Sequence, residues 1–90
     1  LNPVTQDLGQ LSLLSTRELE VLAYVGMGLG VDETAGKLHR SRETVISHRK
    51  ALMRKLGCTT ASQLAVIATS AGLKPGDAER MKHVEMHTQR

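Results

Sequence analysis

A dense cluster of positive side chains lies in the middle of this 90-residue chain. From Arg40 to Lys55 there are six arginines or lysines and one acid, Glu43, so the window carries a net charge of +5. The rest of the chain holds six bases and eight acids, a net charge of −2. Guanidinium and ammonium groups gathered on one segment attract phosphates and release counterions from nucleic acid. A solvated basic surface would have the same composition, so charge alone leaves both interpretations open.

The same window has the spacing of an amphipathic helix. Val45, Leu52 and Leu56 fall on one face of a 3.6-residue period, and polar side chains occupy the opposite face. Ser41 is a natural N-cap, because its hydroxyl oxygen can accept a hydrogen bond from a backbone N–H of the first turn. We therefore predict a basic helix over residues 42–56.

Three further helices are predicted around the basic helix. Ser15 and Glu18 have the spacing of a capping box and start the first of them. A short helix at 29–38 is weakened by Gly36, and only a tight turn separates it from the basic helix. The fourth helix spans 60–71. A short helix, a tight turn and a longer basic helix form a helix-turn-helix, so the predicted fold class is an all-α, four-helix helix-turn-helix domain.

The flanking segments lack a sustained hydrophobic period. We expect residues 1–13 to be a linker or N-terminal arm, 14–73 to form the domain, and 74–90 to be a mostly flexible tail. The chain begins with Leu1 rather than methionine, which is consistent with a piece of a longer protein.

The composition argues against several classes of protein. Proteins that bind single-stranded nucleic acid stack its bases on aromatic side chains. Tyr24 is the only Phe, Trp or Tyr residue of this chain, which argues against that class. The single cysteine, Cys58, excludes an internal disulfide and suits a reducing, cytoplasmic location. No apolar run approaches transmembrane length, so we expect no membrane partner. His83 and His87 have metal-ligand spacing but no third ligand, so we expect no metal and no other cofactor. No catalytic constellation is present, and we expect no enzyme activity.

The fourth predicted helix is unusual because no charged residue occurs between Thr59 and Leu73. One of its faces, which includes Leu64, is expected to belong to the core. The opposite face carries Val66, Thr69 and Leu73 at spacings of three and four residues. We predict that this second face contacts a partner subunit.

Residues of the predicted domain stand at the spacing of a known family: Leu14-Ser15-x-Arg17-Glu18-x-Glu20-Val21-Leu22, Gly28-Leu29, Glu33-x-Ala35, Leu38, Ser41-x-x-Thr44-Val45, His48 and Lys55-Leu56-Gly57. With them the chain resembles the LuxR-type (GerE/NarL-like) helix-turn-helix domains of bacterial regulators. Within that family it is most similar to the RcsB-like response-regulator branch. The resemblance implies that the third helix lies in the major groove of DNA and that the fourth helix forms dimers.

The resemblance also implies roles for individual side chains. Base contacts are implied for Ile46, Ser47 and Lys50. Phosphate contacts are implied for Thr44, Arg54 and Lys55. We expect phosphate contacts for Arg42, His48 and Arg49 too, because half or more of the contacts in such interfaces go to phosphate and sugar. A solvated surface role for Lys50 and a packing role for His48 stay open as alternatives. Ile46 cannot hydrogen-bond a base, but it can pack on a thymine methyl group.

The leading hypothesis is a transcriptional regulator that binds double-stranded DNA sequence-specifically. It would act as a homodimer that is weak without DNA, or as a heterodimer with a related regulator. The alternative is a protein-interaction module that binds another regulator or RNA polymerase through the fourth helix. The operator sequence, the signal and the sign of regulation do not follow from the sequence.

Overall fold

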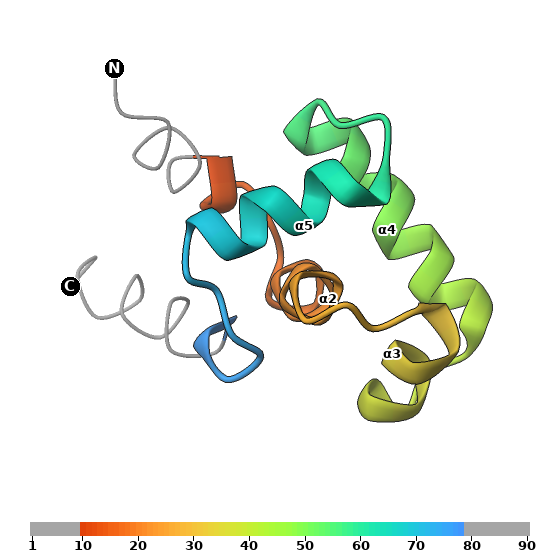
Figure 1. Ribbon diagram of the computed structural model, residues 1–90. Coiled ribbons are helices and arrows are strands. Elements are labelled where there is room, and N and C mark those ends of the chain that lie inside the picture. The colour runs from red at the N-terminus through yellow and green to blue at the C-terminus, as the bar shows by residue number, and fades with distance from the viewer. Residues whose placement is uncertain (1–9, 79–90) are drawn as a thin grey trace, which may run out of the picture.

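The computed structural model describes residues 10–78, in which the chain forms four α-helices of eight residues or more and no β-strand; residues 10–11 and 77–78 are helical as well (Figure 1). The helices are α2 (Thr16–Gly26), α3 (Val31–Leu38), α4 (Arg42–Leu56) and α5 (Ala61–Ser70). The predicted all-α helix-turn-helix fold is confirmed. The bounds of α4 are those predicted, whereas α3 begins two residues later than expected.

Helix α2 forms the centre of the domain. Figure 1 shows it nearly end-on, with α5 crossing on one side and α4 on another. Four of its side chains have no solvent exposure: Leu19, Val21, Leu22 and Ala23. Helix α3 packs against α4. The core is therefore built around α2, and it is aliphatic, as the composition predicts.

The helix starts follow the local hydrogen bonds that the sequence predicts. The Ser15 hydroxyl accepts from the Glu18 N–H at 3.1 Å, and the Ser15 N–H donates to Glu18 Oε1 at 2.9 Å. Ser41 Oγ accepts from the Thr44 N–H at 3.2 Å. Each bond satisfies a backbone donor that the first turn leaves without an intrahelical partner. The capping box of α2 and the N-cap of α4 are both confirmed.

All four helices end in the same way, with one residue in the left-handed conformation followed by a residue whose N–H reaches back to the helix. In three helices that left-handed residue is a glycine. The exception is His39, with φ 55°, in the turn between α3 and α4. The Arg40 N–H then donates to the Ala35 carbonyl at 3.0 Å and closes α3. This turn fixes where α4 begins relative to α3.

Leu73 does not lie where the sequence analysis placed it. It was expected on the outer face of the fourth helix, but it is only 8% exposed and belongs to the core. The helix ends at Ser70, and Gly72, with φ 66°, reverses the chain so that the Leu73 N–H donates to the Ala68 carbonyl at 3.0 Å. A 3.6-residue period does not extend past the end of a helix, so the expectation for Leu73 was wrong.

The core also extends beyond the predicted boundaries at residues 14 and 73. Leu11 and Ala78 have no solvent exposure and join the core cluster. Leu11 lies in a turn in which the Leu14 N–H donates to its carbonyl at 3.1 Å. The predicted linker and tail are thus wrong for the residues nearest the domain. Residues 1–9 and 79–90, which include the rest of both predicted segments, lie outside the described range.

One ion pair ties the start of α2 to the end of α4. Lys55 Nζ donates to Glu18 Oε1 at 2.8 Å, and the side chains are 40% and 8% exposed, respectively. Burial raises the pKa of Glu18. The hydrogen bond from Lys55, the Ser15 N–H and the charge of Lys55 outweigh that effect and lower the pKa below its ordinary value of 4.5. The carboxylate is therefore stabilised in its charged form.

We predict that Glu18→Gln lowers the free energy of unfolding near neutral pH by about 1 kcal/mol. A glutamine keeps the capping box but not the charge opposite Lys55. Because the pKa of Glu18 is lower in the folded state, its contribution is complete above the unfolded pKa and disappears as the pH falls through the folded pKa. The difference between wild type and variant in urea unfolding should therefore shrink below about pH 4.

The matched control is Lys55→Met, which removes the other partner. The double variant should lose no more stability than the loss of one ion pair predicts, because both changes remove the same pair. A difference between wild type and Glu18→Gln that stays constant at every pH would contradict this assignment.

Two helical glycines have opposite surroundings. A Cβ added at Gly26 would lie 2.7 Å from the Ala68 Cβ, so α2 and α5 approach each other closely at this point. A Cβ added at Gly36 would meet no neighbouring atom within 4 Å. The glycine is thus required for packing at Gly26, whereas at Gly36 it only weakens α3.

We predict opposite effects of alanine at these two positions. Gly36→Ala should raise the free energy of unfolding by up to about 1 kcal/mol, because it restricts the unfolded chain and favours the helix. Gly26→Ala should lower it by about 1–3 kcal/mol, because the added methyl group overpacks the contact with Ala68. Urea unfolding of the two variants beside wild type measures both. A loss of stability in Gly36→Ala would show that α3 needs the glycine for close packing.

Candidate nucleic-acid interface

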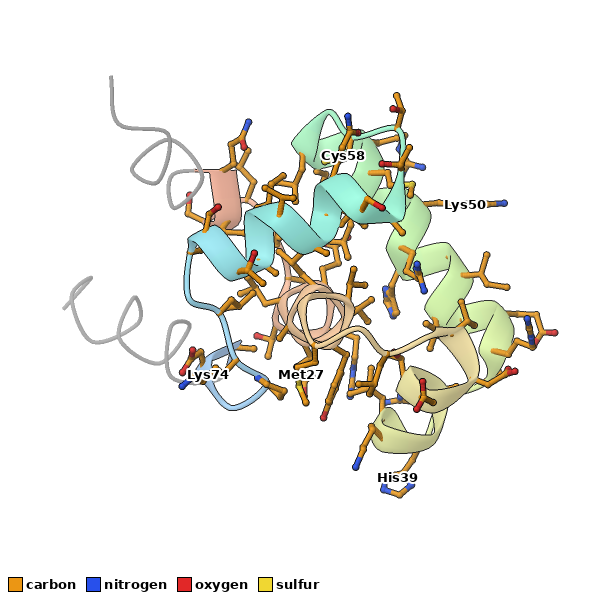
Figure 2. The ribbon with its side chains drawn as sticks, viewed as in Figure 1. Met27, His39, Lys50, Cys58 and Lys74 are labelled. Carbon is orange, nitrogen blue, oxygen red and sulfur yellow. The ribbon has the colours of Figure 1, made fainter. Side chains whose placement is uncertain are left out.

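The two faces of α4 differ sharply in burial. Val45 and Leu52 have no solvent exposure, and Leu56 is 6% exposed, so these residues fix the helix against the rest of the domain. Ser47 and Lys50 on the other side are exposed. Figure 2 shows the Lys50 side chain pointing away from α2 and α5. The burial of one face thus leaves the polar face of α4 turned to solvent.

The structure brings the three predicted base-contact residues together. Ile46 is half-buried, and Ser47 and Lys50 are exposed. Residues three and four apart on a helix are neighbours, so Lys50 lies beside both of the others. The three side chains form one small surface, which combines an aliphatic group, a hydroxyl and an ammonium.

The six predicted phosphate-contact residues divide by exposure. Three are exposed: Arg42, Arg54 and Lys55. Three are half-buried: Thr44, His48 and Arg49. The Thr44 hydroxyl shares a hydrogen bond of 2.9 Å with Ser41 Oγ at the start of the helix. All six lie on α4, so one rigid element carries the whole predicted set.

Two of the predicted cations have acidic partners that the sequence analysis missed. Lys55 is held by Glu18, as described above, and Arg42 Nε lies 3.3 Å from Asp32 Oδ1. The Arg42 pair is open to water, because the side chains are 52% and 80% exposed, so it contributes little to stability. No local spacing rule connects these residues, since each acid lies on a different helix from its cation. Within residues 10–78, Lys50 and Arg54 form no ion pair.

The contact between α3 and α4 fixes the helix-turn-helix. Ala35 and Thr34 on α3 are buried, as is Val45 on α4. The burial of Thr34 was not predicted. Its hydroxyl donates to the Gly30 carbonyl at 2.8 Å, so the polar atom has a partner inside its own helix. The small side chain of Ala35 lies in this contact and allows the two helices to pack closely.

The outer face of α5 is narrower than predicted. Val66 is 62% exposed and Thr69 is exposed, whereas Leu73 has turned into the core. The Thr69 hydroxyl donates to carbonyls of its own helix, at 2.9 Å to Ala65 and 3.1 Å to Val66. Thr69 therefore presents no free hydroxyl hydrogen to a partner.

Two further features limit the chemistry of the described residues. Among residues 10–78, no three His, Cys, Asp or Glu side chains are grouped so that they could hold a metal ion. His83 and His87 lie outside this range. In the same part of the chain, no helix has both the length and the apolar character that crossing a membrane requires.

Comparison with known proteins identifies a family. A family model described as "Bacterial regulatory proteins, luxR family" matches residues 12–68, which is more than half of the chain. The chain is 41% identical over 66 residues to the transcriptional regulatory protein RcsB of Salmonella typhimurium, and 39% identical over 66 residues to RcsB of Escherichia coli K12. Each alignment covers 73% of this chain and 31% of the relative.

A third relative is the oxygen regulatory protein NreC of Staphylococcus aureus, 41% identical over 56 residues, which are 62% of this chain and 26% of that protein. The chain thus spans about a third or less of the length of the relatives it matches. No solved structure matches it significantly. The similarity to RcsB agrees with the branch that the sequence motifs indicated. By the extent of the family match, the chain belongs to the luxR family of bacterial regulatory proteins.

Proposed function

We propose that this domain is the effector domain of a transcriptional regulator and binds double-stranded DNA sequence-specifically, with α4 in the major groove. The observation that carries the proposal is the geometry of α4. Its apolar face is fixed in the core, and its polar face, within the segment of net charge +5, is turned to solvent. A helix of this kind, preceded by a short helix and a tight turn, has the docking geometry of a recognition helix. The names of the relatives RcsB and NreC, both regulatory proteins, agree with it.

The side chains of α4 take two roles in this proposal. Ile46, Ser47 and Lys50 contact base edges in the groove. The surrounding set contacts phosphates: Arg42, Thr44, His48, Arg49, Arg54 and Lys55. Of these, Lys55 is the most constrained, because its ammonium group is held by the buried Glu18. Arg54, which is exposed and forms no ion pair among the described residues, is the cleanest candidate for a phosphate contact.

The experiment measures binding to duplex DNA over a range of salt concentrations. If about four to six phosphates are engaged, log K should fall against log salt with a slope of about −4 to −5. Lys50→Ala should weaken the best site by about 1–3 kcal/mol and relax the preference at one base pair. Arg54→Ala should weaken all sequences about equally and reduce the slope by about one.

Each variant is the control for the other, since both remove one exposed positive charge from the same helix. Identical behaviour of the two would show that Lys50 contacts only phosphate. A slope near zero for the wild-type domain would contradict DNA binding. It would favour the alternative function, a protein-interaction module that contacts another regulator or RNA polymerase through α5.

We further propose that α5 joins two domains on DNA, as a homodimer or as a heterodimer with a related regulator. Val66 supports this proposal, because it is the one large hydrophobic side chain of α5 that is strongly exposed. No charged residue occurs on α5, so desolvating its outer face carries a low electrostatic cost. With Leu73 in the core, the surface is small, and small interfaces give weak association. Two domains bound to adjacent half-sites would meet at high effective concentration.

We predict that Val66→Glu leaves the domain folded, because the side chain is outside the core, but abolishes cooperative occupation of an operator with two half-sites. The measurement compares binding to one half-site with binding to two. The matched control is Met27→Glu, which introduces the same charge at another exposed hydrophobic residue, 58% exposed at the end of α2. An equal loss of affinity on one and two half-sites in Val66→Glu would exclude this face as the dimer surface.

A further inference from the structure

Ile46 is an aliphatic residue of α4 whose side chain is partly open to solvent. It is only half-buried, and it is absent both from the core cluster and from the partly buried hydrophobic residues packed against it. Met53, in contrast, is half-buried on the same helix and does pack against the core. Isoleucine is also a weaker helix former than alanine, because its branched side chain loses rotamer freedom in a helix. Part of an aliphatic side chain is therefore available for contact on the side of α4 that carries Ser47 and Lys50.

Three of the four residues that lie three or four positions from Ile46 on α4 are cations, and the fourth is Glu43. Arg42 precedes it by four residues and Lys50 follows it by four, so the three side chains form one row along α4. Both cations are exposed. An aliphatic group with positive charge on either side suits a surface that holds phosphates at its edges and an apolar group between them. In double-stranded DNA, the major groove offers one such group, the 5-methyl group of thymine.

We propose that Ile46 is a specificity-determining residue that reads one thymine in each half-site by contact with its 5-methyl group. This inference rests on the proposed function, because it requires α4 in the major groove. Cytosine presents an amino group and hydrogen at the corresponding edge, and uracil lacks the methyl group while keeping every hydrogen-bonding atom of thymine. The contact therefore depends on shape and apolar surface, not on a hydrogen bond.

The position of the thymine follows from the helix geometry. Four residues of an α-helix rise by about 6 Å, and successive base pairs are about 3.4 Å apart. The thymine should therefore lie within about two base pairs of the base that Lys50 contacts. Removing a buried methyl group from such an interface should weaken binding about fourfold for each thymine.

The experiment replaces each thymine of the preferred duplex in turn with deoxyuridine and measures affinity at constant salt. Wild type should lose about fourfold at one position in each half-site and little elsewhere. Ile46→Ala should bind the thymine and uracil duplexes equally at that position, whereas Ile46→Val should keep most of the discrimination. Lys50→Ala should bind more weakly overall but keep the ratio between thymine and uracil. Helical circular dichroism of each variant confirms that it is folded.

The outcomes separate this inference from the proposed function. Specific binding with no sensitivity to uracil at any position would overturn the role of Ile46 and leave the DNA-binding proposal intact. The same conclusion follows if Ile46→Ala discriminates thymine from uracil as strongly as wild type. No binding to duplex DNA at all would overturn both proposals.

Discussion

Burial of α2 on almost every side is the constraint from which the rest of the domain follows. Its fully buried side chains point in several directions, so one neighbour cannot cover them, and both α4 and α5 must pack around it. Gly26 and Ala68 let α5 approach so closely that no additional methyl group would fit. Once α2 is enclosed, the orientation of α4 is determined by Leu52 and Leu56. The solvent-facing surface of α4 is therefore a result of how the core is filled.

The acids of the domain shape the positive surface of α4 as much as its bases do. Glu18 holds Lys55 at one end of the helix, in a pair of which only the carboxylate is buried, and Asp32 lies beside Arg42 at the other end. Lys50, in the middle of α4, and Arg54, in its last turn, form no ion pair among the described residues. Two of the exposed cations of α4 thus have an acidic partner, and two have none among the described residues. A count of charges along the sequence does not reveal this distribution.

The sequence predicted the features that depend on local interactions. The caps at Ser15 and Ser41 were predictable because both hydrogen-bonding partners lie within three residues. The bounds of α4 were predictable from its cap and its apolar period. The exposure of Val66 was also predictable, because this residue lies inside a helix, where the 3.6-residue period holds.

Several features that sequence reasoning missed depend on how parts of the chain that are distant in sequence come together. Leu73 is buried because the backbone reverses at Gly72, and Leu11 and Ala78 are buried near the two ends of the described range. Neither segment has a period that would signal burial. The pairing of Glu18 with Lys55 joins residues far apart in the sequence, and it becomes visible only when α2 and α4 are packed together.

Glu18 also links two parts of the domain that would otherwise open independently. The same carboxylate oxygen accepts from the Ser15 N–H at the start of α2 and from Lys55 in the last turn of α4. Fraying of the first turn of α2 moves this oxygen away from Lys55, and detachment of the last turn of α4 leaves a desolvated carboxylate without its counter-ion. Each local opening therefore carries part of the free-energy cost of the other. The first turn of α2 and the last turn of α4 are therefore expected to open together rather than separately.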